Sequence, residues 1–316
     1  MEFYGEFQLA LIITIILALV GIALLYGGAK FLVVGASNIA ISLGISKLVV
    51  GLTVVAIATG SPELLVSLFA TIKGSDTISV GNIIGSNIIN TLLILGISLL
   101  ISPIKPDKRL HKIELPIMLI ASVLLAIFVS YGEIPRWGGA ILVAGMIATM
   151  WIQIKLRHTL GRPQNEEKKE KTWIQILWIA LGAILLVFGS KLFIESAIAI
   201  AKTFSIPNSV IAVTLVALGT SLPELATCIY SARNSHPDLT MGNLIGSNIF
   251  NIFGVLGICA LVYPLDISSK ALQTDSYILL ATAIILFFMM KLKKQLSWGS
   301  GIFLLLLYVG YTISII

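Results

Sequence analysis

The sequence predicts an all-α integral membrane protein of ten transmembrane helices, arranged as two inverted repeats of five helices each. Three observations predict this class. Of the 316 residues, 57% are hydrophobic and 11% charged, with a mean hydropathy of +1.01, whereas a soluble domain carries about a quarter charged residues. The apolar residues form stretches long enough to cross the hydrocarbon core, which takes roughly 20 residues as a helix. The second half of the chain also repeats the first.

Ten apolar stretches separated by polar connections mark the expected spans. They are 8–41, 48–72, 78–101, 113–130, 136–156, 172–201, 208–232, 238–262, 272–291 and 297–315. The first span lacks the basic start and small-residue cleavage site of a signal peptide, so we expect the mature protein to keep it. Cys228 and Cys259 lie within apolar stretches, so we expect small packing residues rather than a disulfide or a metal pair.

The basic residues lie mainly on one face of the predicted membrane protein. The connections on the side of both termini carry Lys73, Arg136, Lys202 and Lys270. The opposite connections carry fifteen basic residues: Lys47, Lys105, Lys108, Arg109, Lys112, Lys155, Arg157, Arg162, Lys168, Lys169, Lys171, Arg233, Lys291, Lys293 and Lys294. The positive-inside rule places the second set in the cytoplasm. We therefore expect a multi-pass protein of the cell (plasma) membrane with both termini outside, and no nucleic-acid partner despite the net charge of +6.

The repeat is explicit in two pairs of segments. GNIIGSNIINTLLILGI (81–97) returns as GNLIGSNIFNIFGVLGI (242–258), and TVVAIATGSPELLVS (53–67) returns as TLVALGTSLPELATC (214–228), both shifted by 161 residues. Because each copy holds five spans, an odd number, the second copy must enter the membrane from the opposite face. Inverted repeats of this kind are typical of secondary transporters. The expected domains are a first repeat (1–157), a cytoplasmic linker (158–171) and a second repeat (172–316).

Two glutamates lie within predicted membrane spans, at a depth where the membrane holds little water. Glu63 and Glu224 follow Pro62 and Pro223 in the second and seventh spans. A proline cannot donate the backbone hydrogen bond of a helix interior, so each frees a carbonyl oxygen of the preceding turn. Broken backbone at membrane depth is tolerated only where protein, water or an ion satisfies it, and an intramembrane carboxylate marks an ion path by default. We expect the two acids to hold a cation, with freed carbonyls beside them.

The GN-x-x-GSN segments add neutral oxygen ligands to the same place. Their glycines predict that the third and eighth helices are also broken. In each copy a serine and an asparagine four residues apart share one helix face; they are Ser86 with Asn90 and Ser247 with Asn251. Carboxylates, amides, hydroxyls and carbonyls suit hard cations such as Ca²⁺, which takes six to eight oxygens. Soft metals prefer His or Cys, and the three histidines fall at loops or span ends, so we expect no transition-metal site and no cofactor.

Several of these residues also have structural interpretations. GNIIG and GNLIG match the small-xxx-small pattern of close helix packing, although packing does not account for paired acids beside prolines. Lys30 and Lys191 are expected to extend toward the interface rather than bind substrate. Glu195 has no acidic counterpart in the first copy and is expected to be an ion-pair or surface residue.

The two segments resemble the alpha repeats of the calcium/cation antiporter superfamily, especially the prokaryotic sodium/calcium exchangers. ALGTSLPEL (217–225) and GNLIGSNIFN (242–251) match that pattern almost residue for residue, and the similarity extends over the whole chain. The resemblance implies ten helices, with spans 2, 3, 7 and 8 forming an ion-binding core and the long spans 1 and 6 sliding across it. It also implies that the protein is no enzyme, with Ca²⁺ and monovalent cations as partners, the lipid bilayer around it and no obligatory protein partner.

The resemblance further implies a ligand set. The carboxylates of Glu63 and Glu224 would bridge a central Ca²⁺, joined by backbone oxygens at Thr59 and Thr220. Monovalent positions would use Ala56, Ala217, Ser86, Ser247, Ser221 and the same two threonines. Asn90 and Asn251 would line the middle of the pocket.

Two departures from the family pattern bear on the counter-ion. Gly60 stands where the second copy has the hydroxyl of Ser221, with Ser61 as the neighbouring hydroxyl, and Asn251 stands where several sodium/calcium exchangers have an aspartate. The pocket thus holds two acids, which one Ca²⁺ balances. Two protons could also balance them, because burial and a neighbouring carboxylate favour the neutral form of a carboxyl group. The proton/calcium branch usually carries Asn-x-x-Glu at the acid, whereas this chain has GSPE and SLPE, which favours Na⁺.

The sequence therefore predicts an antiporter that exchanges Ca²⁺ for monovalent cations by alternating access, with Na⁺ favoured and H⁺ or a K⁺-dependent variant as alternatives. A cation channel is a further alternative, and it would not show obligatory exchange. An intramembrane enzyme using the two glutamates as an acid/base pair is disfavoured, because the chain has no HExxH zinc motif and no histidine within a span.

Overall fold

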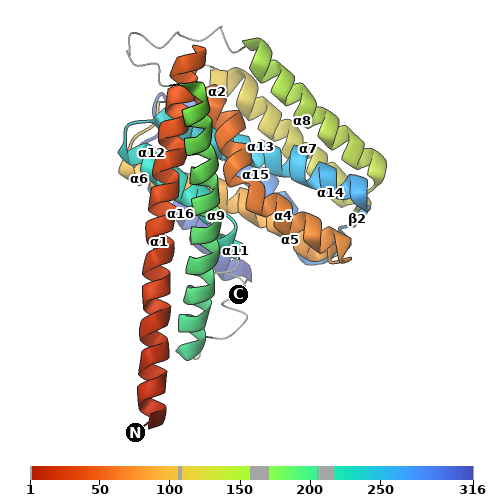
Figure 1. The fold of residues 1–316 in the computed structure, drawn as a ribbon. Helices are drawn as coiled ribbons and strands as arrows, with labels where there is room; N and C mark the ends of the chain where they lie inside the picture. Colours follow the sequence, from red (N-terminus) through yellow and green to blue (C-terminus); the bar gives the residue numbers. More distant parts are fainter. Residues whose placement is uncertain (1, 106–108, 157–170, 205, 207–216, 316) are drawn as a thin grey trace.

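The structure, a computed structural model, describes residues 2–105, 109–156, 171–204, 206 and 217–315 (Figure 1). The first half contains α1 (Glu2–Leu43), α2 (Lys47–Val50), η1 (Gly51–Val55), α3 (Ala56–Thr59), α4 (Ser61–Ile72), α5 (Asp76–Ile88), η2 (Ile89–Ile94), α6 (Leu95–Ile101), η3 (Leu110–Glu114), α7 (Leu115–Tyr131), β1 (Glu133–Ile134) and α8 (Arg136–Leu156). The second half contains α9 (Thr172–Thr203), α11 (Ala217–Gly219), α12 (Leu222–Arg233), α13 (Pro237–Ile249), η5 (Phe250–Leu256), α14 (Gly257–Val262), β2 (Leu265–Asp266), α15 (Lys270–Leu292) and α16 (Trp298–Ile315). The η segments are π-helical turns.

Within the described residues, eight continuous helices are long and apolar enough to cross a membrane, and one bent pair makes a ninth. The eight are Leu11–Leu43, Asp76–Ile101, Leu110–Tyr131, Arg136–Lys155, Thr172–Thr203, Pro237–Val262, Lys270–Leu292 and Trp298–Ile315, and the bent pair is Lys47–Thr59 with Ser61–Ile72. The nine agree with predicted spans. The other predicted span, 208–232, lies partly outside the described residues, and its described part is α11 and α12. The predicted linker 158–171 lies outside them except for Lys171.

The two longest helices, α1 and α9, pack side by side and run in opposite directions (Figure 1). Glycines allow this close contact. A Cβ atom at Gly28 would lie 2.8 Å from the carbonyl oxygen of Gly182, and one at Gly182 would lie 2.6 Å from the backbone nitrogen of Leu32. Away from this seam both helices present large apolar side chains outward, for example Leu19 and Phe188, which are 60% and 63% exposed. Such faces suit contact with lipid.

The centre of the molecule is formed by the two helices that carry the GN-x-x-GSN segments. In the most apolar stretch of Asp76–Ile101, 78% of residues are buried, and in that of Pro237–Val262, 83%, against 17% for α1. The largest cluster of buried apolar residues includes Ile84, Ile88, Ile245 and Ile249 from these two helices. Polar groups on the central helices are therefore placed far from water.

The repeat is visible in the structure as well as in the sequence. Helices α4 and α12, helices α5 and α13, and the π-helical turns η2 and η5 begin at positions shifted by 161 residues. The π-helical turns include Asn90 and Asn251, and such turns inside α-helices are frequent at functional sites. The chain thus builds the same local structure twice around its two copies of the motif.

The expectation that the third and eighth helices are broken is wrong. Asp76–Ile101 and Pro237–Val262 are continuous spans, and the glycines within them do not interrupt the helix. In the second copy these glycines allow close packing instead. A Cβ atom at Gly242 would lie 2.6 Å from the carbonyl oxygen of Leu48, and one at Gly246 would lie 2.7 Å from the Cα atom of Leu52. The packing interpretation therefore holds for the second copy.

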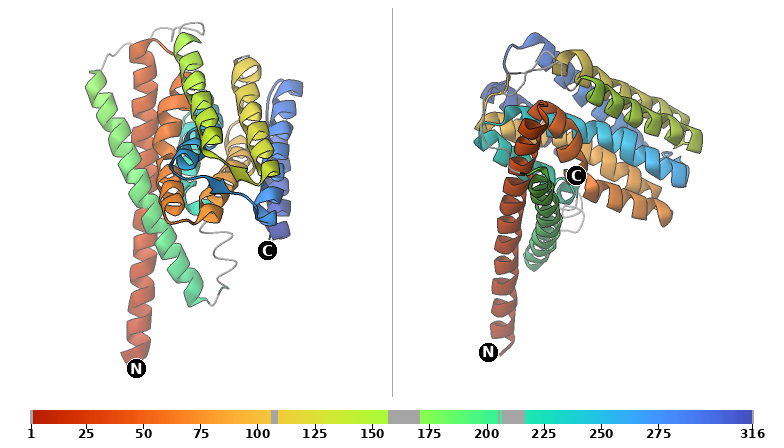
Figure 2. Two further views of the ribbon diagram at one scale, coloured as in Figure 1. Left: turned by 90° about the vertical axis from the view of Figure 1, so that its right-hand side faces the viewer. Right: turned by 45° about the horizontal axis from the view of Figure 1, so that its top comes forward.

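Three contacts join connections between helices. In each, the two connections lie on the same face of the membrane according to the predicted spans. Strand β1 pairs antiparallel with β2, and Ile104 bridges to Leu296. The Lys47 ammonium lies 3.5 Å from Nδ1 of His236. The two termini lie toward one end of the molecule, whereas the end of α8 and the start of α9 lie at the other (Figures 1 and 2). This arrangement agrees with an even number of crossings.

One charged residue of a predicted polar connection is buried. Arg109 is 4% exposed and donates from Nε to Oε1 of Glu114 at 2.7 Å. Gln153 of α8 accepts a hydrogen bond from Arg109 and donates to the other carboxylate oxygen of Glu114 at 2.5 Å. Buried charges are expected to be paired, and this network joins the start of the η3–α7 helix to α8. Both cysteines are buried and free, as predicted.

Candidate functional site

The two glutamates are carried by helix breaks at equivalent positions. Helix α3 ends at Thr59, the chain bends by 46°, and α4 begins at Ser61, so that Glu63 lies in its first turn. In the second copy α11 ends at Gly219 and α12 begins at Leu222, with Glu224 in its first turn. The prolines fall at the first positions of α4 and α12, where a missing N–H is tolerated. Each break thus places a carboxylate beside a helix N terminus.

Both carboxylates are fully buried and contact hydroxyls of the central helices. The Ser86 hydroxyl donates to Oε1 of Glu63 at 3.2 Å, and the Ser247 hydroxyl donates to Oε1 of Glu224 at 3.4 Å. Both glutamates are 0% exposed. The Ser221 hydroxyl, three residues before Glu224, donates at 3.0 Å to the Ser86 hydroxyl that bonds Glu63, so a short chain of hydrogen bonds joins the two breaks. The structure therefore brings together the two acids predicted from opposite halves.

The threonines at the two breaks, Thr59 at the end of α3 and Thr220 directly after α11, are held by asparagines of the opposite copy. The Thr59 hydroxyl donates to Oδ1 of Asn243 at 3.0 Å, and the Thr220 hydroxyl donates to Oδ1 of Asn82 at 3.1 Å. The sequence interpretation missed Asn82 and Asn243 as site residues. The signal was available, because both copies carry an asparagine directly after the first glycine of the GN-x-x-GSN segment.

The remaining predicted asparagines belong to a buried amide network. Asn251 donates to the Ser86 hydroxyl at 3.2 Å and to Oδ1 of Asn87 at 2.9 Å. Asn90 donates to Oδ1 of Asn248 at 3.2 Å. Because Asn87 lies in α5 and Asn248 in α13, the network ties η5 to α5 and η2 to α13. It also fixes which amide oxygens remain available.

Four oxygen atoms of the site have no hydrogen-bond partner among the described residues. They are Oε2 of Glu63, Oε2 of Glu224, Oδ1 of Asn90 and Oδ1 of Asn251, and all are buried. A buried acceptor without a partner costs about 1–3 kcal/mol, and more when it is charged. Within the described part of the chain no group of three or more His, Cys, Asp or Glu side chains gathers to hold a metal. A cation here would be held by two acids and neutral oxygens.

The other predicted ligands have different surroundings in the two copies. Ser221 is buried and donates to the Ser86 hydroxyl at 3.0 Å. Its counterpart Gly60 offers no hydroxyl, and Ser61 does not replace it, because the Ser61 hydroxyl donates to the carbonyl oxygen of Ile57 at 2.8 Å. The carbonyl of Ala56 accepts from the Gly60 N–H at 2.9 Å. Ala217 begins α11. The two halves of the pocket are therefore unequal.

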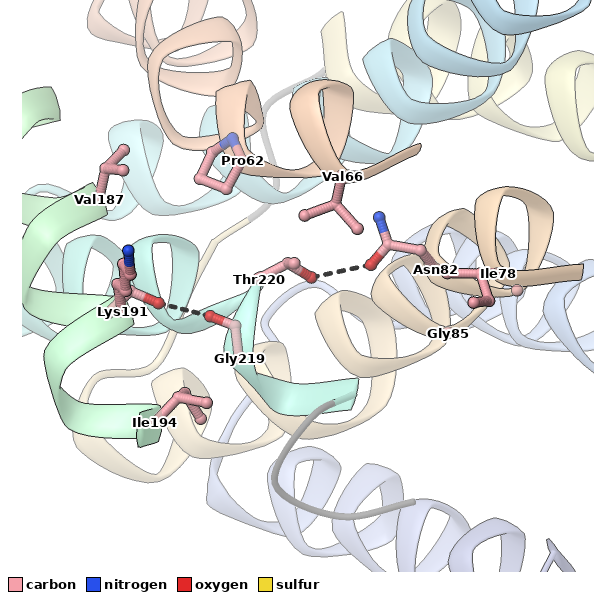
Figure 3. A pocket seen from close by; sticks show the side chains of 12 residues that line it. Pro62, Val66, Ile78, Asn82, Gly85, Val187, Lys191, Ile194, Gly219 and Thr220 are labelled. Atoms are coloured by element: carbon pink, nitrogen blue, oxygen red, sulfur yellow. Dashed lines mark hydrogen bonds between the residues drawn. The ribbon is translucent and has the colours of Figure 1, made fainter. Parts of the chain in front are cut away.

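A cavity of about 500 Å³ reaches the site from the side of the first break (Figure 3). It lies between α4 and α5 on one side and α9 and α11 on the other, and Asn82, Gly85, Lys191 and Thr220 are among its lining residues. Figure 3 shows Asn82 facing Thr220 from α5. Lys191 pairs with Glu195 at 3.9 Å, and both side chains are exposed. The structure thus confirms the predicted ion-pair role of Glu195 and places Lys191 at the cavity.

The equivalent region of the second copy is filled by protein. Gly81 and Gly85 line the cavity, and a Cβ atom at Gly85 would meet nothing within 4 Å among the described residues. Their counterparts Gly242 and Gly246 are buried against η1 and α2, as described above. Among the described residues, a cavity therefore lies beside α5 and close helix packing beside α13, and the counterpart of η1, residues 212–216, lies outside them.

Fold and site together are those of a multi-pass membrane protein in which two helix breaks place two buried acids among neutral oxygen atoms, as in a transporter of cations. Comparisons with known proteins agree. A family model described as "Sodium/calcium exchanger protein" matches the chain twice, over residues 13–155 and 174–316. The chain therefore belongs to the sodium/calcium exchanger family. It is accordingly a cation/Ca²⁺ antiporter and not an enzyme.

Relatives and solved structures are similar over nearly the full chain. The putative antiporter CaxA of Alkalimonas amylolytica is 35% identical, covering 95% of this chain and 98% of that protein. The sodium/calcium exchanger MaX1 of Methanosarcina acetivorans is 30% identical, covering 95% and 98%. A solved structure of the sodium-calcium exchanger NCX_Mj, soaked with Na⁺ and Sr²⁺, superposes with a TM-score of 0.83 at 32% identity, covering 95% of this chain and 97% of that one.

Proposed function

We propose that this protein exchanges Ca²⁺ for Na⁺ across the membrane, and that Ca²⁺ binds between Glu63 and Glu224. The observation that carries the proposal is the set of four buried oxygens without partners, two from carboxylates and two from the amides of Asn90 and Asn251. An ionised carboxylate cannot remain unpaired at membrane depth at low cost. Hard cations coordinate such oxygens, and one Ca²⁺ balances two carboxylates.

Na⁺ is favoured as the counter-ion for two reasons. Hydroxyls of Ser86, Ser247 and Ser221 surround the carboxylates and add neutral oxygens that a monovalent cation can use. Two similar proteins, MaX1 and NCX_Mj, are named as sodium/calcium exchangers. Protons remain the alternative counter-ion, because two protons would balance the same two carboxylates. Ala56, Ala217, Thr59 and Thr220 would contribute further oxygens at the two breaks.

Coupling follows from competition for one pair of acids. Ca²⁺ and the counter-ions neutralise the same carboxylates, so they bind in turn and not together. The cavity beside α5 would give access from the side of Ile78, which begins a predicted span on the side of both termini. An inverted second copy would allow the equivalent region beside α13 to open in turn. Lys47 precedes the second span of the first copy, whereas His236 follows the second span of the second copy. Two parallel copies would place these residues on opposite faces of the membrane, so their contact supports the inversion.

The proposed orientation follows the basic residues. We infer that both termini and the open cavity face the outside and that the connections rich in Lys and Arg face the cytoplasm of the cell membrane. Ion exchange would then begin from the outside in the conformation described here. An inward Na⁺ gradient would drive Ca²⁺ out of the cell.

Uptake of radiolabelled Ca²⁺ into proteoliposomes tests the proposal. Vesicles loaded with Na⁺ and diluted into Na⁺-free buffer should accumulate Ca²⁺, and a pH gradient alone should not drive comparable uptake. Glu63→Gln and Glu224→Gln should each abolish uptake, because each leaves Ca²⁺ with one carboxylate. Glu133→Gln, an exposed acid in β1, should not change it.

Three outcomes would contradict parts of the proposal. Near-normal uptake by both site variants would remove the glutamates from the mechanism. Uptake driven by a pH gradient and indifferent to Na⁺ would assign protons as the counter-ion. Ca²⁺ flux without any ion on the opposite side would indicate a channel.

A further inference from the structure

A second cavity lies at the basic face of the molecule, between the start of one helix and the end of another. Its volume is about 240 Å³. His111, Lys112 and Leu115 line it from η3 and the start of α7, and Phe287 and Lys291 line it from the end of α15. None of these five residues lines the cavity of Figure 3. It is therefore a separate feature from the ion site described above.

Among the described residues, the lysines of this cavity have no acid as a partner. Lys112 and Lys291 are both exposed, and neither forms an ion pair with an acid in the described part of the chain. Glu114, which lies in the same η3 turn, is buried and bonded to Arg109 and Gln153, so its charge is already balanced. An anion in the cavity would therefore meet two ammonium groups that have no other counter-charge.

The other lining groups add to what an anion needs. The Lys291 ammonium lies 5.9 Å from the centre of the Phe287 ring, a cation–π contact that holds the charge beside the cavity. The Nε2 atom of His111 is buried and has no hydrogen-bond partner among the described residues, so the imidazole has a nitrogen left for a further partner. The cavity is several times larger than one water molecule, whose share of liquid volume is about 30 Å³. It therefore suits a polyatomic anion with several oxygens better than a single halide ion.

The position of the cavity favours a lipid headgroup as that anion. Helix α15 ends at Leu292, and the η3–α7 helix begins at Leu110, so the cavity lies where two spans leave the hydrocarbon. Phe288 and Leu292 are 50% and 77% exposed, and exposed apolar side chains at the end of a span suit contact with acyl chains. Both lysines belong to the connections that the positive-inside rule places in the cytoplasm. The anionic lipids of that leaflet attract basic residues near the surface.

We propose that this cavity binds the phosphate headgroup of an anionic phospholipid, with the ammonium groups of Lys112 and Lys291 on the phosphate oxygens and the His111 imidazole as a further donor. Lysine is a common phosphate ligand and acts as a point charge. Phe287 and Leu115 would contact the apolar part of the same lipid. The bound lipid would join α7 to α15, which belong to different copies of the repeat. The proposal does not depend on which ions the protein exchanges.

Thermal unfolding of the purified protein in the presence of lipid tests the proposal. Dioleoylphosphatidylglycerol is titrated into the protein in detergent, and dioleoylphosphatidylcholine and inorganic phosphate are titrated in parallel. A ligand that binds the folded state raises the unfolding midpoint according to its affinity and concentration. The double variant Lys112→Gln, Lys291→Gln removes both ammonium groups from the cavity.

A second double variant, Lys155→Gln with Lys171→Gln, is the matched control. It removes the same charge from the same predicted face of the membrane, outside the cavity. Lys155 also resembles Lys291 in its surroundings, because its ammonium lies 4.8 Å from the centre of the Trp151 ring. A loss that follows from overall charge alone would therefore appear in both double variants.

Phosphatidylglycerol should raise the midpoints of the unaltered protein and of the control variant until the site is saturated. The cavity variant should need about tenfold more lipid, or more, for the same rise, because it loses two charge-assisted hydrogen bonds. Phosphatidylcholine should raise the midpoint of the unaltered protein less, since its choline group brings a positive charge toward the lysines. Midpoints without lipid show whether each variant is folded. If the cavity variant does not fold, the comparison of the two lipids on the unaltered protein decides.

An equal response of the two double variants to phosphatidylglycerol would overturn the proposal. Equal responses of the unaltered protein to the two lipids, or no response to either, would also overturn it, because the cavity would then not select an anionic headgroup. A response to inorganic phosphate that matches the response to phosphatidylglycerol would replace the lipid by a free anion as the occupant. The exchange of Ca²⁺ proposed above stands or falls separately, by the uptake measurements.

Discussion

At the scale of single residues, the site depends on asparagines that orient its threonines. Asn243 accepts from the Thr59 hydroxyl at 3.0 Å and donates to the sulfur of Cys228 at 3.4 Å. It lies in α13 and so ties that helix to the first break. Without it, Thr59 would lose the partner that fixes its side chain beside Glu224. Asn82 makes the equivalent bond to Thr220 in the other half.

Asn243→Ala should therefore weaken Ca²⁺ binding. One hydrogen bond contributes about 0.5–1.5 kcal/mol, and 1.4 kcal/mol corresponds to about tenfold in affinity, so we expect a loss of up to about tenfold. Isothermal titration calorimetry with Ca²⁺ measures it. Thr53→Val is the control, because the Thr53 hydroxyl donates only within its own helix, to the carbonyl oxygen of Val49 at 2.7 Å. Equal Ca²⁺ affinity of Asn243→Ala and Thr53→Val would remove Asn243 from the binding machinery.

At the scale of helices, equivalent glycines have different surroundings in the two copies. Gly246 packs against η1, where a Cβ atom would lie 2.7 Å from two backbone atoms of Leu52. Gly85 faces the open cavity. A backbone neighbour cannot move aside as a flexible side chain can, so substitution at Gly246 must separate two helices. Among the described residues, substitution at Gly85 meets no neighbour and narrows the cavity.

Gly246→Val should accordingly destabilise the fold, by about 1–3 kcal/mol or more, as overpacking of a buried site does. Gly85→Val should keep the thermal stability of the unaltered protein in detergent while slowing Ca²⁺ uptake through the narrowed cavity. Thermal unfolding and proteoliposome uptake measured on both variants separate the two effects. Similar losses of stability in both would show that the asymmetry does not hold in the membrane protein as purified.

The helices also show what sequence could and could not predict. Span boundaries were predicted to within a few residues, because apolar runs and polar connections follow directly from membrane thickness. The bend before Glu63 and the helix break before Glu224 were predicted because proline cannot continue the hydrogen-bond ladder. The prediction from the glycines of the central helices was wrong. Glycine can break a helix or allow a neighbouring helix to pack closely, and which of the two occurs depends on the partner helix. The π-helical turns at Asn90 and Asn251 leave no signature in composition.

The same distinction applies within the site. The duplicated acids, hydroxyls and amides identified the pocket, because two copies of one motif must meet around one centre. Gly60 packs against Phe250, where an added Cβ atom would lie 3.0 Å from Cδ1 of the ring, and Phe250 is distant in sequence and unremarkable in an apolar span. Its ring position follows from the packing of η5 on α4. No local pattern contains that information.

At the scale of the whole molecule, alternating access depends on the two copies having opposite orientations. Lys73 and Asn234 test this directly, because they are equivalent under the shift of 161 residues and directly follow α4 and α12. Both are exposed. An inverted repeat places them on opposite faces of the membrane, whereas a parallel repeat would place them on one face.

Single cysteines at these two positions report the orientation. The native Cys228 and Cys259 are both buried, so they should not react and need not be replaced. A membrane-impermeant maleimide should label Lys73→Cys on intact cells and label Asn234→Cys only after permeabilisation, since the positive-inside rule places the Arg233 side in the cytoplasm. The reverse pattern would keep the inversion but turn the protein over, and would place the open cavity inside the cell. Labelling of both positions from one side would exclude the inversion, and with it the expectation that the region beside α13 opens as the cavity beside α5 closes.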